Sequence, residues 1–118
     1  MVEPEFGGLI IMYNEFDFIA ILKYKTFDEG GRSTPAKSGY RPQLCFDFEK
    51  NSTSGRQVFI DKEWVCPGES VEAKITMLSP QLFENKLYEG LGFKFCEGRT
   101  IVGNGTILKI LNEKLIRK

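Results

Sequence analysis

A period of two in the apolar residues is the feature that most restricts how this chain can fold. It is clearest over residues 71–77, where every odd-numbered position is apolar and every even-numbered position is Glu, Lys or Thr. Successive side chains of a β-strand point to opposite faces, so this pattern predicts a strand with one buried face. The same period predicts further strands at 16–24, 44–49, 91–96 and 106–111.

The last of these runs, 106–111, differs from the others because it is almost continuously apolar, and we expect it to be buried on both faces. Glycine, proline and small polar residues separate the runs, and we interpret them as turns. The turn segments are Gly30-Gly31, 51–55 and Pro67-Gly68, and we interpret 103–105 as a bulge or turn. Only residues 80–88 could hold a helical turn. Short strands with frequent turns predict an all-β protein, a small closed antiparallel β-barrel.

The composition fits one domain with a single core, since 42% of the 118 residues are apolar. Sixteen basic and sixteen acidic residues cancel, so no overall field draws the chain to nucleic acid or to a membrane. Basic residues nevertheless exceed acidic ones in 32–56 and in 99–118. No apolar run has the length of a signal peptide core or of a membrane span, so we expect a cytoplasmic protein without membrane contact.

Several kinds of catalytic residue are missing from the sequence. The chain has no histidine, which excludes Ser-His-Asp and Cys-His catalysis and histidine-containing zinc sites. It also lacks the glycine-rich phosphate loop that would hold GTP. Cys45, Cys66 and Cys96 match no zinc or redox spacing, and we expect Cys45 and Cys96 to be small, buried, reduced residues. We therefore predict that the protein is not an enzyme and takes no cofactor, metal or small-molecule substrate.

Three motifs rich in glycine, proline and arginine occur in order along the chain. They are Glu29-Gly30-Gly31-Arg32-Ser33-Thr34-Pro35 with Gly39-Tyr40-Arg41-Pro42-Gln43, then Pro67-Gly68-Glu69, and finally Gly98-Arg99-Thr100 with Val102-Gly103-Asn104-Gly105. Together they resemble the third, C-terminal domain of bacterial elongation factor Tu, over residues 16–111. The resemblance implies a six-stranded barrel that, in the whole factor, packs on its sister domains and contacts the T arm of aminoacyl-tRNA.

By this resemblance the chain divides into three parts. Residues 1–15 are an N-terminal extension and a candidate extra edge strand, 16–111 are the barrel, and 112–118 are a basic C-terminal tail. The tail is either a short helix or a frayed end. A barrel of this kind exposes surfaces that sister domains would cover, so we expect self-association or coverage of that surface by residues 9–13.

The resemblance also implies two sets of contact residues. Candidate contacts to tRNA or to a partner are Arg32, Ser33, Gln43, Glu97, Gly98 and Arg99. Candidate members of an inter-domain or partner face are Gly30, Gly31, Tyr40 and Arg41. Arginine side chains and the backbone amides of glycine turns can hold phosphates without reading sequence. The structural alternatives are an ion pair for Arg41, turn formation by the glycines, and packing roles for Tyr40 and Trp64.

Two functions remain open at this point. The first is a non-catalytic binding module related to elongation factor Tu, which lacks the GTPase domain and contacts aminoacyl-tRNA or a protein of the translation system. Ser33, Ser79 and Glu97 depart from the residues that this family directs at tRNA. The second function is therefore a repurposed stand-alone barrel that binds proteins without RNA.

Overall fold

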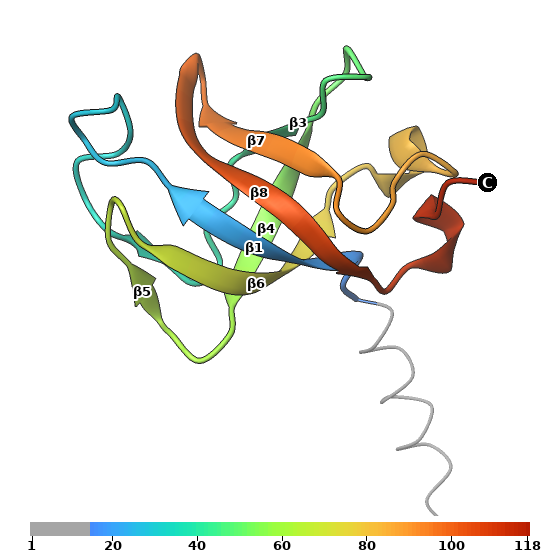
Figure 1. The fold of residues 1–118 in the computed structure, drawn as a ribbon, viewed down its shortest axis with the longest axis horizontal. Helices are drawn as coiled ribbons and strands as arrows, with labels where there is room; N and C mark the ends of the chain where they lie inside the picture. Colours follow the sequence, from blue (N-terminus) through green and yellow to red (C-terminus); the bar gives the residue numbers. More distant parts are fainter. Residues whose placement is uncertain (1–14) are drawn as a thin grey trace, which may run out of the picture.

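The computed structural model describes residues 15–118 and shows an all-β protein built on a closed barrel. Six antiparallel strands close the wall in the order β1-β6-β4-β3-β7-β8, and β8 pairs back with β1 (Figure 1). They are β1 Phe18–Tyr24, β3 Gln43–Cys45, β4 Thr53–Phe59, β6 Ser70–Met77, β7 Gly92–Glu97 and β8 Thr100–Ile110. The six-stranded antiparallel barrel is confirmed. The candidate edge strand of the N-terminal extension and the covering segment 9–13 lie outside the described residues.

Four short elements lie outside the barrel wall. Strands β2 Ala36–Lys37 and β5 Trp64–Val65 pair with each other as a small two-stranded sheet. Two 3-10 helices, η1 Pro80–Phe83 and η2 Glu113–Leu115, follow β6 and β8. Element η1 falls in the one segment where a helical turn was expected. Within residues 15–118, neither helix has the length or apolar character to cross a membrane.

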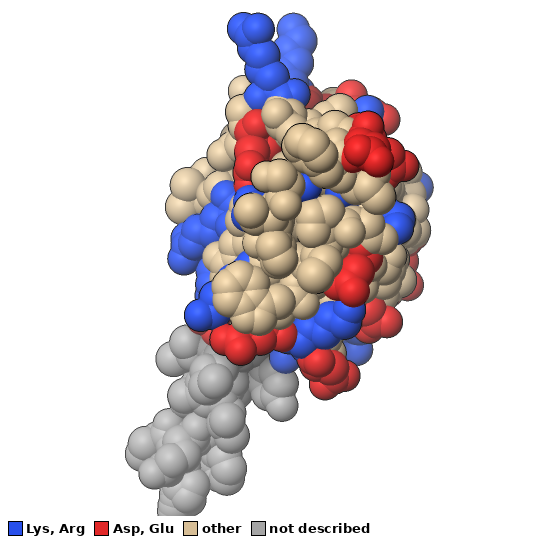
Figure 2. All heavy atoms as spheres, turned by 90° about the vertical axis from the view of Figure 1, so that its left-hand side faces the viewer, with Lys and Arg blue, Asp and Glu red and all other residues tan. Residues whose placement is uncertain are grey.

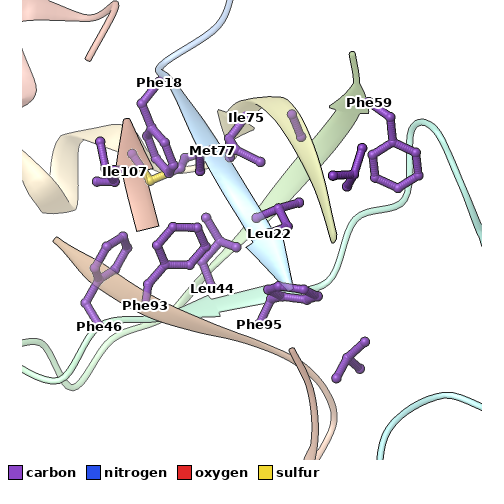
Figure 3. Packing of buried hydrophobic residues seen from close by; sticks show 14 of the residues in the cluster. Phe18, Leu22, Leu44, Phe46, Phe59, Ile75, Met77, Phe93, Phe95 and Ile107 are labelled. Atoms are coloured by element: carbon purple, nitrogen blue, oxygen red, sulfur yellow. The ribbon is translucent and has the colours of Figure 1, made fainter. Parts of the chain in front are cut away.

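The alternating side chains of the strands form the core. In β6 every second residue is buried, which is the pattern predicted for 71–77. Figure 3 shows the aromatic rings of β7, Phe93 and Phe95, pointing inward toward Leu22 of β1 and Leu44 of β3. The Phe93 ring also packs edge-on against Phe18, with 5.7 Å between ring centroids. These large rings fill the interior of the barrel, which is therefore a packed core and not a channel.

The segment 103–105 was interpreted as a bulge or turn, and the turn is wrong, because the segment lies in the middle of β8. Gly103 is paired with Phe95 and Gly105 with Phe93 across the β7–β8 ladder. A Cβ at Gly103 would clash with the Phe95 ring, and one at Gly105 would clash with the Phe93 ring. The glycines are therefore strand residues that leave room for the two rings inside the barrel.

Three other sequence expectations differ from the structure. Strand β4 was not predicted, because its residues Gly55, Arg56 and Gln57 break the apolar alternation. The run 44–49 leaves the barrel wall after Cys45. Cys45 lies on the outer face of β3, and both Cys45 and Cys96 are only partly buried, although we expected both to be buried. The run 106–111 is not buried on both faces, since the side chain of Leu108 is 42% exposed.

The two ends of the barrel carry different segments. The C-terminal end comprises residues 46–52, 78–91 and 111–118, and the loop end comprises residues 25–42, 60–69 and 97–100. In Figure 1 the C-terminal end lies to the right and the loop end to the left.

Residues 112–118 fold back onto the C-terminal end rather than extending from it. The side chain of Leu115 in η2 is fully buried. The Asn85 N–H donates to the Lys114 carbonyl at 2.9 Å, and the Arg117 N–H donates to the Leu87 carbonyl at 2.8 Å. The buried Asp17 carboxylate, just before β1, accepts hydrogen bonds from the Asn112 side chain and from the backbone of β6. This segment thus contains the short 3-10 helix η2 and is held to the barrel.

A candidate binding site at the loop end

Arg32, Tyr40 and Glu97 meet at the loop end and are called the Arg32 cluster below. The Arg32 guanidinium forms an ion pair with the Glu97 carboxylate. The Tyr40 hydroxyl donates a hydrogen bond to the same carboxylate. The guanidinium carbon lies 4.8 Å from the centroid of the Tyr40 ring, within the range of a cation–π contact. Three predicted site residues, from three separate segments, are therefore brought into direct contact.

The turn before Arg32 sets its direction. The Gly31 N–H donates to the Thr26 carbonyl at 2.9 Å, which closes the loop that follows β1. A Cβ on Gly31 would lie 2.6 Å from the Lys25 carbonyl oxygen, so only glycine fits there. The Glu29 carboxylate accepts a hydrogen bond from the Thr26 N–H at 2.9 Å, and this bond lowers the pKa of Glu29. The glycine pair thus forms the turn that positions Arg32 in the cluster.

The remaining donors of Arg32 also point at its own chain. Its Nε donates to the Thr34 carbonyl at 3.2 Å, and one terminal nitrogen donates to the Thr34 hydroxyl at 3.1 Å and the Pro35 carbonyl at 3.2 Å. Burial opposes the charge of Arg32, but contacts with Tyr40 and Glu97 outweigh it and raise the pKa. The guanidinium therefore stays charged, and its hydrogen bonds are used within the molecule.

A second polar pair lies beneath the cluster in the barrel. The buried Tyr24 hydroxyl donates to the side-chain oxygen of Gln57, while the Gln57 amide nitrogen has no hydrogen-bond partner among the described residues. The rings of Tyr24 and Tyr40 lie 6.4 Å apart. Burial is the main cause that raises the pKa of both phenols, so both remain neutral hydrogen-bond donors near pH 7. The Tyr24 and Tyr40 rings thus lie between the cluster and a buried polar pair in the core.

The other predicted site residues are distributed around this cluster. Gly98 and Arg99 form the exposed tip of the β7–β8 hairpin, and Ser33 is exposed in the loop that follows Gly31. Gln43 lies on the outer face of β3, where its side chain accepts a hydrogen bond from Ser52 at 3.0 Å. Arg41 is exposed and lines a shallow surface hollow together with Arg56 and Thr76. The side-chain hydrogen bond of Gln43 and the surface hollow at Arg41 thus do not involve the Arg32 cluster.

Two exposed aromatic residues at the same end were not predicted as part of the site. Phe27 is 64% exposed and Trp64 is 53% exposed. The packing role expected for Trp64 is therefore wrong, while Tyr40 is partly buried in the cluster. Figure 2 faces the side of the molecule with β5 and the loop after β1, and shows a broad uncharged area bordered by basic and acidic side chains. A pattern of alternating residues could not reveal this, because β5 is only two residues long.

Neither a metal site nor a family assignment adds to this description. Among residues 15–118, no three His, Cys, Asp or Glu side chains are grouped as metal ligands would be. No protein-family model matches the chain. The site is thus defined by its own geometry: a charged cluster satisfied from within, next to exposed aromatic side chains.

Proposed function

We propose that this chain is a non-catalytic protein-binding module, built on a barrel of the kind found at the C-terminus of elongation factor Tu, and that its loop end is the binding face. The observation that carries the proposal is the exposure of Phe27 and Trp64 at the same end of the barrel as Arg32, whose side chain is hydrogen bonded within the molecule. Aromatic residues contribute large apolar area to protein interfaces, and they are enriched among the residues that dominate binding energy.

The charge arrangement favours a protein over RNA. Binding to RNA depends on basic side chains that present their charge to phosphates. At the loop end, the positive charge of Arg32 is neutralised by Glu97, which would also repel a phosphate placed next to it. Glu29 and Glu63 are further carboxylates in these loops. A phosphate placed at Arg32 would therefore have to displace intramolecular contacts before it could bind that guanidinium.

Exposed aromatic rings also occur at the C-terminal end, but these are engaged by neighbours. The Phe48 ring lies 5.6 Å from the ring of Phe46, and the Arg117 guanidinium lies 4.1 Å from the Tyr88 ring. For the Trp64 ring, the one such neighbour within residues 15–118 is the Lys37 ammonium, 5.6 Å from the ring centroid. Phe27 makes no aromatic or cation–π contact with any residue in 15–118. Phe27 is thus the most exposed aromatic side chain at either end.

Aminoacyl-tRNA is the second candidate partner, and one observation favours it. Arg99 stands exposed at the tip of the β7–β8 hairpin, at the same end as the Gly30-Gly31 turn. An outward arginine and a glycine turn at one end of the barrel support this candidate, because the resemblance to elongation factor Tu implies tRNA contacts from groups of this kind. Such binding would consist mainly of phosphate contacts, so it would weaken steeply with salt.

The test compares a loop-end variant with a matched variant of the other end. Tagged wild-type protein, the double variant Phe27→Ser, Trp64→Ser, and the control Phe48→Ser are used for quantitative affinity purification with crosslinking. We expect the partner to be reduced at least tenfold by the double variant and retained by Phe48→Ser, which is 47% exposed in the wild type. A partner that all three proteins capture equally would contradict the proposed face.

Two further measurements separate the remaining possibilities. Gel-shift titrations with aminoacyl-tRNA at low and high salt test the second candidate: a shift that is lost with Arg99→Ala and with salt would replace a protein partner by RNA. Size-exclusion chromatography tests the expected self-association. A dimer that the Phe27→Ser, Trp64→Ser variant converts to a monomer would identify the protein partner as a second copy of this chain.

A further inference from the structure

We propose that Cys45 and Cys96 are a modification site, a dithiol that oxidises reversibly to a disulfide between β3 and β7. The two Sγ atoms lie 3.9 Å apart on neighbouring strands. The register pairs Cys45 with Lys94 and Gln43 with Cys96, so the two cysteines are diagonal neighbours on the outer face of the barrel. The inference is independent of the proposed binding partner.

The reach and the access of the two thiols fit this chemistry. A disulfide requires the sulfurs to be about 2 Å apart, so rotation of the side chains and a small approach of the strands must bring them together. Both side chains are partly exposed, so a small oxidant and a reductant can reach them. The third cysteine, Cys66, is exposed in the loop before β6 and serves as an internal comparison.

The position of the pair gives the crosslink a structural effect. Strand β3 is three residues long, and it joins β4 through only two register pairs, Gln43–Ser54 and Leu44–Thr53. It is therefore the shortest strand of the barrel wall. Cys96 directly precedes Glu97, which holds Arg32 and Tyr40. A bond between Cys45 and Cys96 would tie this short strand to β7 and restrain the strand that carries Glu97.

With hydrogen peroxide as the oxidant, the reaction balances in two steps. One thiolate attacks a peroxide oxygen, the O–O bond breaks, and the sulfur becomes a sulfenic acid while hydroxide leaves and takes up a proton as water. The second thiolate attacks the sulfenic sulfur, the S–S bond forms, and the S–O bond breaks to release a second water. Two thiols are oxidised by two electrons, and one peroxide is reduced to two waters.

The surroundings of Cys96 bear on the rate of this reaction. Burial is the main cause that raises the pKa of the Cys96 thiol, and the neighbouring Cys45 raises it further. The ammonium groups of Lys94 and Lys25 act in the opposite direction. Because the thiolate is the reactive form, the pair is expected to react more slowly at neutral pH than an ordinary exposed thiol.

The experiment uses the full chain carrying Cys66→Ser, so that the pair is the only source of thiols. Millimolar hydrogen peroxide should remove both free thiols, lower the intact mass by two hydrogen atoms, and join the peptides containing residues 45 and 96. Dithiothreitol should reverse all three changes. The melting temperature of the oxidised protein should rise by roughly 5–15 °C, because the crosslink restricts the unfolded chain.

Matched variants make the outcome decisive. Adding Cys45→Ser or Cys96→Ser to the same background should abolish the mass loss and the rise in melting temperature. As a control, a background with Cys66→Ala in place of Cys66→Ser should show the same mass loss and the same rise in melting temperature. Oxidation of the intact pair to sulfinic acids, or only to disulfides between molecules, would overturn the proposal, as would a linked peptide pair without any thermal shift or reversal.

Discussion

The two ends of the barrel are closed by different kinds of contact. At the C-terminal end, the chain returns and buries Phe83, Leu87 and Leu115, each with no exposed surface. The loop end also buries Ala36 and Val65, but it carries in addition the polar and charged groups of the Arg32 cluster and two exposed aromatic side chains. Apolar burial contributes stability in proportion to area, whereas a partly exposed ion pair contributes little.

This difference separates a stabilising end from an end that is available for recognition. The C-terminal end buries Phe83, Leu87 and Leu115 inside the molecule, and the backbone of 112–118 is hydrogen bonded to the segment before β7. The loop end holds its conformation through directed hydrogen bonds and tight glycine turns, which leaves Phe27 and Trp64 in contact with solvent. Substitutions at the C-terminal end should therefore mainly lower stability, whereas substitutions at the loop end should mainly lower binding.

The largest expected effect is the loss of stability when the C-terminal end is weakened. Leu115→Ala removes a fully buried side chain and leaves a cavity, so the free energy of unfolding should fall by about 2–5 kcal/mol. Trp64→Ser at the loop end should change it by less than about 1 kcal/mol, because the ring is half exposed. Urea denaturation of both variants measures this. Equal losses would break the distinction between the two ends.

The sequence predicted the barrel where local pattern and tertiary environment agree. Residues 71–77 alternate because one face of β6 packs in the core, and the other is exposed or partly buried. Strand β4 escaped prediction because tertiary contacts outweigh its local preference: Gly55 faces the side chain of Leu44, and the inward Gln57 is held by Tyr24. The same holds for Gly103 and Gly105, which are typical turn residues but make room for two rings.

The candidate site was predictable only in part. Arg32 and Glu97 were each selected by motif, but their pairing joins residues 65 positions apart and depends on the register of β7 and β8. No local pattern carries that information. The exposure of Trp64 depends on which face of a two-residue strand points outward, and the Cys45–Cys96 contact depends on the register of β3 with β7. Both require the folded barrel.

A smaller effect is expected from Glu97→Gln, which sharpens the description of the loop end. The change removes the charge that neutralises Arg32 but keeps an acceptor for Tyr40. Since both partners are partly exposed, the coupling energy with Arg32→Ala should be about 0.5–1 kcal/mol. The pair Lys37–Glu63, at 3.7 Å and more exposed, is the control and should couple by less than about 0.3 kcal/mol. Double-mutant cycles in urea measure both values, and a loop-end coupling as small as the control would show that the cluster does not hold the loops.

The smallest effect is a difference in acid response between Glu29 at the loop end and Glu49 at the C-terminal end. Both pKa values lie below the usual 4.5, so each carboxylate favours the folded state at neutral pH. This contribution is present above about pH 4.5 and is lost as the pH falls through the folded pKa, because the unfolded chain then binds more protons.

The first cause for Glu29 is the backbone hydrogen bond from Thr26, whereas for Glu49 it is the side chain of Lys86, 2.9 Å away. Salt screens an exposed ion pair more than a hydrogen bond from the backbone. In urea denaturation between about pH 3 and pH 6, Glu49→Gln should therefore flatten the acid slope at low salt but little at high salt, while Glu29→Gln should flatten it at both. Equal effects of salt on the acid slopes of the two variants would show that both carboxylates are held by the same kind of contact.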